Sequence, residues 1–213
     1  LDMGSKIQQC INTDEYDNIK SVVNDYLKEG IAHTLDETRN LSDSGQFEDI
    51  SLQQGIRQIL YPYEEMEVLN PEWEVILKDI IDSLFEQMSD EEYNILNEEF
   101  GTYMVSRAYE YRQLLEYFVF RYFAKSIYDY DFLGKCQMLV TNFFVIRQMD
   151  IIRWLDNHRE YSFKDRMDVV HIFSRQVEYS EDNIENLYED FIFDDIFKTD
   201  SLIAILWIDS ENI

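Results

Sequence analysis

The chain has 213 residues, 46% of them hydrophobic and 15% aromatic, so it can build a substantial core and is not expected to be disordered. Only six glycines and two prolines are present, which disfavours a sandwich or barrel with many tight turns. The formal charge of -26 disfavours nucleic acid and anionic membranes as partners, and it either attracts a basic, lysine-bearing protein or only keeps the chain soluble.

The negative charge is unevenly distributed along the chain. Residues 112–176 hold ten Lys and Arg against eight Asp and Glu, a net of +2, whereas the remainder holds eight against 36, a net of -28. The near-neutral segment is also the most aromatic. We therefore expect it to form the water-free centre of the domain, with the acidic segments as a solvated shell.

Cysteine usage and hydropathy predict a cytoplasmic protein. The two cysteines, Cys10 and Cys136, form no CxxC pair and are interpreted as reduced thiols. No signal peptide is visible, and no run reaches the roughly 18 apolar residues of a membrane span. The opening "LDMGS", residues 1–5, is interpreted as a cloning remnant, so the fold prediction begins at residue 6.

The first elements are predicted from their end signals. Residues 6–39 read as an N-terminal helical segment in which Thr13 is an N-cap and Gly30 ends the helix. The polar residues 40–50 are predicted to be a loop. Residues 51–213 then form the main helical domain, and the whole chain is expected to be one domain.

Four sequence signals mark helix boundaries in the first half of the main domain. Pro62 is expected to break the preceding helix. Asn70 is an N-cap, with a proline in the first helical position behind it. Ser89 and Glu92 have the spacing of a capping box. Gly101 is predicted to separate that helix from the next one, which is expected to run to about residue 128.

The longest helix is predicted over residues 131–156, with Asp131 as its N-cap. Apolar residues cover nearly every face of it, which is typical of a central, buried helix. Arg147, Asp150 and Arg153 near its middle exclude a membrane span.

Further helices are predicted after caps at Ser162 and Ser180, whereas the tail over 201–208 fits either a helical turn or a short strand. The fold class is therefore all-α, a helical bundle with a long central apolar helix surrounded by amphipathic helices.

Familiar catalytic motifs are missing, and no metal-binding spacing is visible. The chemical candidates are charges inside the aromatic and apolar helices. Glu116 can pair with Arg112 at i, i+4, and Asp150 can pair with Arg147 or Arg153. Such charges either form structural ion pairs or line a pocket for a polar molecule or a peptide side chain. The pocket candidates are Glu116, Arg121, Arg147 and Arg175.

The order of segments resembles the helical part of flagellin lysine-N-methylases. The resemblance rests on an aromatic helix in "EYFVFRYF", a long apolar helix with a central arginine, and the run "SRQVEYS", and it spans about residues 6–195. The matching positions are Glu116, Tyr117, Arg121, Tyr122 and Phe123, then Arg147, then Ser174, Arg175, Glu178, Tyr179 and Ser180. The cysteine-rich region that the family carries ahead of these helices has no counterpart in this sequence, so the chain is expected to be a helical C-terminal portion of such an enzyme or a variant that has lost the region.

The resemblance implies methylation of lysine ε-amines on flagellin with S-adenosyl-L-methionine as cofactor. It assigns catalytic roles to Glu116 or Glu178, which would orient the amine, and to Tyr117, which would help to enclose it. The cofactor-binding residues implied are Arg121, Arg147, Arg175 and Tyr122, with arginine taking the cofactor carboxylate. A non-catalytic alternative remains open, in which an acidic helical domain binds a basic partner protein.

Overall fold

A computed structural model describes residues 1–28 and 50–211 of the chain, with side chains to residue 209. Every regular element in these ranges is helical, which confirms the all-α fold class. No helix within them combines the length and the apolar character needed to cross a bilayer. The predicted end at Gly30 and most of the predicted loop over 40–50 lie outside the described residues.

Local sequence signals account for most of the helix boundaries. The α-helices are α1 (Asp2–Asn12), α3 (Leu52–Glu64), α4 (Pro71–Ile80), α5 (Asp90–Met104), α6 (Ala108–Tyr122), α7 (Ser126–Asp129), α8 (Phe132–Asp156), α9 (Phe163–Phe173), α10 (Glu181–Phe193) and α11 (Thr199–Glu211). Residues 16–28 are also helical. The tail is therefore a helix, which resolves the ambiguity over 201–208.

Several caps are confirmed in atomic detail. The Asn70 side chain accepts the amide of Glu72 at 3.2 Å, and Asp131 accepts that of Gly134 at 2.8 Å. A full capping box closes the start of α5 at Ser89, and a second one closes α9 at Ser162. Each satisfies amides that a helix N-terminus leaves without intrahelical partners.

Three expected boundaries are wrong. Pro62 lies inside α3 and is buried, and the helix ends two residues after it, so the hydrogen bond that proline cannot donate is lost only in the last turn. Gly101 is buried within α5, and the break comes later, at the 3-10 turn η2 (Val105–Arg107). Thr13 follows α1 as its C-cap instead of starting a helix, and its hydroxyl donates to the Gln9 carbonyl at 3.0 Å.

Helix α8 has 25 residues, of which 18 are buried, and α1, α3, α4, α6, α9, α10 and α11 all contact it. Many of these buried side chains are polar, so "apolar" describes the helix poorly. Thr141 and Asn142 bind the hydroxyl of Tyr63 at 3.2 and 2.9 Å, and Gln148 accepts that of Tyr93 at 2.9 Å. Hydrogen bonds to neighbouring helices thus offset the cost of burying polar groups along α8.

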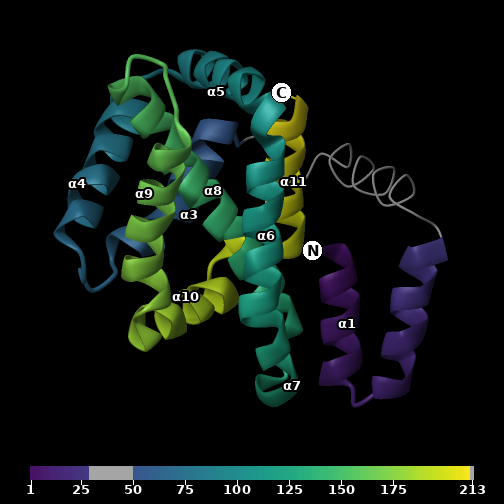
Figure 1. Ribbon diagram of the computed structural model, residues 1–213. Coiled ribbons are helices and arrows are strands. Elements are labelled where there is room, and N and C mark those ends of the chain that lie inside the picture. Colours follow the sequence, from purple (N-terminus) through teal and green to yellow (C-terminus); the bar gives the residue numbers. More distant parts are fainter. Residues whose placement is uncertain (29–49, 212–213) are drawn as a thin grey trace.

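The arrangement places α4 and α9 side by side, with α8 behind them (Figure 1). After α9 the chain continues into a π-helical segment, η4 (Ser174–Glu178), and α10 then crosses beneath. Gln176 in η4 accepts the backbone amides of Leu69 and Asn70 at 2.9 and 3.3 Å. These bonds fix the end of α9 beside the start of α4, so the two helices run in opposite directions.

The α1 helix packs against α8 at the side of the molecule (Figure 1). A Cβ on Gly4 would lie 2.6 Å from the Cys136 sulfur, so a larger residue at this position would force the Cys136 side chain or α1 to shift. Residues 2–5, which were left out of the fold prediction, therefore belong to a packed helix.

Candidate functional site

The structure brings together four of the residues that the resemblance selected. Glu178 at the end of η4 is buried, and its carboxylate accepts the hydroxyl of Tyr117 at 3.1 Å and that of Tyr122 at 3.1 Å. The Arg121 Nε lies 3.7 Å from the same carboxylate. Three residues of α6 thus converge on one acid in η4, and we call them the Glu178 cluster.

Electrostatics in the Glu178 cluster keep both phenols protonated. Burial raises the pKa of Tyr122 far above its usual value, and the adjacent charge of Glu178 raises it further. Burial and the Glu178 charge also raise the pKa of Tyr117. Both hydroxyls are therefore hydrogen-bond donors near neutral pH, so neither can act as a base. The two hydroxyls therefore hold the Glu178 carboxylate in place.

Glu116 does not join this cluster. Its side chain is 54% exposed and accepts the Arg112 Nε at 2.9 Å. The predicted i, i+4 pair is confirmed, but the expectation that Glu116 lies in a water-free centre is wrong. It projects from the outer face of α6, whereas Phe118 and Tyr122 occupy the inner face. Arg121 is also partly exposed, at 38%.

Arg147 is buried as expected, but with other partners. Its guanidinium pairs with Asp209 of α11 at 3.4 Å and donates to the Asn97 side chain of α5 at 3.0 Å. The expected pair with Asp150 does not form. Arg147 therefore joins α8 to α5 and α11, and none of these contacts involves the Glu178 cluster.

Asp150 pairs with Arg166, not with Arg147 or Arg153. The Asp150 carboxylate is fully buried and accepts the hydroxyls of Tyr111, at 2.6 Å, and Tyr161. Arg166 reaches on to Glu110 at 3.3 Å. Burial raises the pKa of Asp150, and the Arg166 charge only partly opposes this.

Sequence reasoning missed Arg166 and Glu110, which lie in charged stretches that read as solvated helix faces. The available signal was the amphipathic register of α9, where Arg166 shares the inner face with Val169 and Phe173. Their partners are distant in the sequence, so spacing rules for one helix could not identify them.

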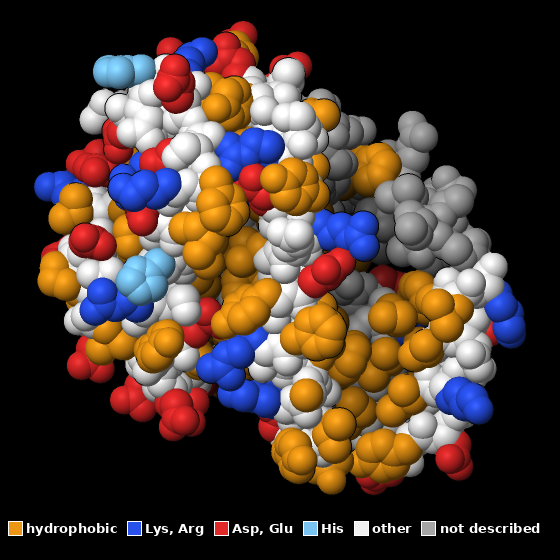
Figure 2. Space-filling view, viewed as in Figure 1, with side chains coloured by type: hydrophobic (Ala, Val, Ile, Leu, Met, Phe, Trp, Pro, Cys, Tyr) orange, Lys and Arg blue, Asp and Glu red, His pale blue; other side chains and the backbone are white. Residues whose placement is uncertain are grey.

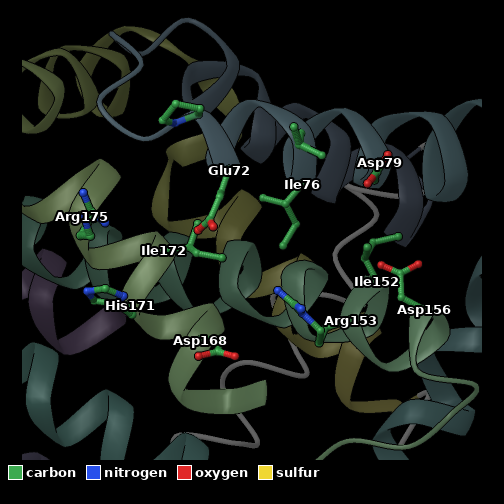
Figure 3. Close-up of a pocket in the computed structure, with 12 residues that line it drawn as sticks. Glu72, Ile76, Asp79, Ile152, Arg153, Asp156, Asp168, His171, Ile172 and Arg175 are labelled. Carbon is green, nitrogen blue, oxygen red and sulfur yellow. The ribbon is translucent and has the colours of Figure 1, made fainter. Parts of the chain in front are cut away.

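The last predicted site residue, Arg175, lies in a groove. The groove has a volume of about 710 Å³ and lies between α4, α8 and α9 (Figure 3). Its apolar lining includes Ile76, Ile152 and Ile172. Its charged and titratable lining consists of Glu72, Asp79, Asp156 and Asp168 with Arg153, His171 and Arg175. We call it the α4–α9 groove.

The π-helical turn relates the groove to the Glu178 cluster. Arg175 and Glu178 belong to the same turn of η4, yet Arg175 faces the groove and Glu178 faces α6. π-Helical turns often occur at functional sites because they re-aim side chains within a helix. In the described part of the chain, no group of three or more His, Cys, Asp or Glu is arranged to hold a metal ion.

A comparison with known proteins identifies the family of the chain. The family model for the FliB lysine N-methylase C-terminal domain matches residues 1–205. No curated protein and no solved structure matches the chain. The family match includes α6, α8, α9 and η4, which carry the Glu178 cluster and the groove. The chain therefore belongs to the family of FliB lysine N-methylase C-terminal domains.

Proposed function

We propose that this domain binds a lysine-bearing segment of flagellin for methylation of a lysine ε-amine, and that the α4–α9 groove receives the segment. One observation carries the proposal: four carboxylates line an open groove together with aliphatic side chains, and two of them, Asp79 and Asp156, lie at the end away from Arg175. A lysine side chain has matching chemistry, a four-carbon apolar stem and a cationic head. The reaction would take place in the cytoplasm.

The groove carboxylates are better placed to orient the amine than the acids selected by resemblance. Glu178 already accepts two hydroxyls and lies beside Arg121, and Glu116 pairs with Arg112 on the outer surface. We therefore assign amine binding to Asp79 and Asp156. Glu178, Tyr117 and Tyr122 act as positioning residues that hold η4.

S-adenosyl-L-methionine would supply the methyl group as an electrophilic sulfonium. Of the arginines selected for its carboxylate, Arg147 pairs with Asp209, and Arg121 lies beside Glu178 and over the Tyr122 ring. Arg175 has no ion-pair partner among the described residues and faces the groove. Its free guanidinium therefore fits a carboxylate, and we assign this role to Arg175.

Calorimetric titration with a lysine-bearing flagellin fragment tests the proposal. Asp79→Asn combined with Asp156→Asn should weaken binding about tenfold or more, because two charge-assisted contacts are lost. Glu116→Gln is the matched control, since it removes an exposed carboxylate outside the groove. Equal affinities for all three proteins would contradict the assignment of the groove.

The non-catalytic alternative is favoured by the -28 charge outside residues 112–176. A domain that binds through this general field should respond weakly to groove variants and strongly to salt. Strong, salt-sensitive binding of the flagellin fragment, unaffected by the groove variant and without methyl transfer in the presence of the methyl donor, would support that alternative.

A further inference from the structure

The α4–α9 groove has different charges at its two ends. Arg175 and His171 lie at the end formed by η4 and the start of α4, and Asp79 and Asp156 lie at the other (Figure 3). Arg153 and Asp168 lie between them. The Gln176 bonds to the backbone before α4 fix which helix ends meet.

We propose that the groove binds its ligand in one orientation, with an ammonium group at the Asp79 and Asp156 end and a carboxylate at Arg175. This inference rests on the proposed function, because it takes the ammonium group to be the substrate lysine. Both end groups are available for pairing: Arg175, Asp79 and Asp156 have no ion-pair partner among the described residues. Such a ligand forms a charge pair at each end of the groove, and its middle part contacts the apolar lining.

The length of α4 along the groove gives an order-of-magnitude separation of its two ends. Glu72 and Asp79 are seven residues apart on α4, about 10 Å at 1.5 Å per residue, and the Glu72 end adjoins η4. An extended peptide spans about 3.3 Å per residue, so the separation corresponds to about three residues. The carboxylate can belong to an acidic residue about three positions from the lysine or to the amino-acid part of the methyl donor.

Glu72 opposes a carboxylate at this end. It belongs to the first turn of α4, and its side chain lies above Ile172 in the groove (Figure 3). Replacing it with glutamine removes a like charge and should therefore tighten carboxylate binding. This gain cannot be confused with damage to the fold, which would weaken binding.

Calorimetry with three peptides tests the inference: one with a single lysine, one with glutamate three residues after the lysine, and one with glutamate three residues before it. One glutamate peptide should bind about tenfold more tightly than the lysine-only peptide. Arg175→Gln should remove this difference, and Glu72→Gln should enlarge it. Arg112→Gln, an exposed arginine outside the groove, is the control.

A parallel titration with S-adenosyl-L-methionine identifies the source of the carboxylate. If Arg175→Gln weakens methyl-donor binding while the three peptides bind equally, Arg175 binds the donor carboxylate, as the proposed function assigns it, and the inference of an oriented peptide is overturned. If Arg175→Gln changes the affinity for neither the peptides nor the methyl donor, the inference is overturned. The proposed function then still stands, provided that the Asp79 and Asp156 variant loses the lysine-only peptide.

Discussion

At the scale of single residues, the Glu178 carboxylate depends on hydroxyls that differ in burial. Tyr122 is 1% exposed and Tyr117 is 45% exposed, yet each donates to Glu178 at 3.1 Å. Tyr122→Phe should lower the free energy of unfolding by about 1–2 kcal/mol, because no water replaces the lost donor. Tyr117→Phe should cost less, since solvent reaches its hydroxyl position. Urea unfolding measures both, and equal losses would contradict the difference in solvation.

The buried ion pair between Asp150 and Arg166 should contribute more to stability than these hydroxyls do. Arg166→Met leaves both Asp150 and Glu110 without their shared buried cation, so we expect a loss of about 3–5 kcal/mol in the free energy of unfolding. Arg159→Met is the control, because Arg159 forms an exposed pair with Glu99 and its loss should cost below about 1 kcal/mol. A mild effect of Arg166→Met would show that the network is not energetically coupled.

The pH dependence of this variant has a defined sign. Burial already raises the pKa of Asp150 in the folded protein, and removing the Arg166 charge should raise it further. The folded state then holds the proton more tightly than the unfolded state, so stability falls as the pH rises from the ordinary aspartate range through the raised pKa. Relative to the original protein, Arg166→Met should recover stability in acid. Urea unfolding of both proteins across this pH range measures the difference.

At the scale of elements, the contact between α3 and α11 depends on a glycine. A Cβ on Gly55 would lie 2.9 Å from Cγ1 and Cδ1 of Ile205, both in a buried side chain. Gly55→Ala should therefore destabilise the protein by about 1–3 kcal/mol despite the better helix propensity of alanine. Adding Ile205→Ala relieves the clash, so the double variant should be more stable than the sum of the single losses predicts. Strict additivity in thermal unfolding would contradict the clash.

Elements were predictable where their signals are local. The caps at Asn70, Ser89 and Asp131 depend on residues two or three positions away, and all formed as expected. The partners of Arg147 and Asp150 are Asp209 and Arg166, which only packing between helices brings close. The π-helical turn that separates Arg175 from Glu178 likewise has no recognisable spacing in the sequence. For these reasons, the groove could not be predicted from the residues of the family motif.

At the scale of the whole molecule, the near-neutral segment is only partly a buried centre. Helix α8 is enclosed, but aromatic and aliphatic side chains of α6 and α7 gather on the surface (Figure 2). Phe120 is 85% exposed, and Ile127 and Tyr128 are also well exposed. The expectation of an acidic shell around a neutral interior is therefore wrong along this face. Helix α6 is thus aromatic on both sides but buries only one of them.

The buried and exposed sides of α6 predict different stability losses for two phenylalanines that are two positions apart on this helix. Phe118 is 1% exposed and packs against Tyr122 and Phe173, whereas Phe120 faces solvent. Phe118→Ala should lower the free energy of unfolding by about 3–5 kcal/mol, and Phe120→Ala should change it by less than about 0.5 kcal/mol. Urea unfolding of the two variants compares them directly. A large loss for Phe120→Ala would mean that another surface covers this face in solution, because only burial gives a phenylalanine ring that much stabilising free energy.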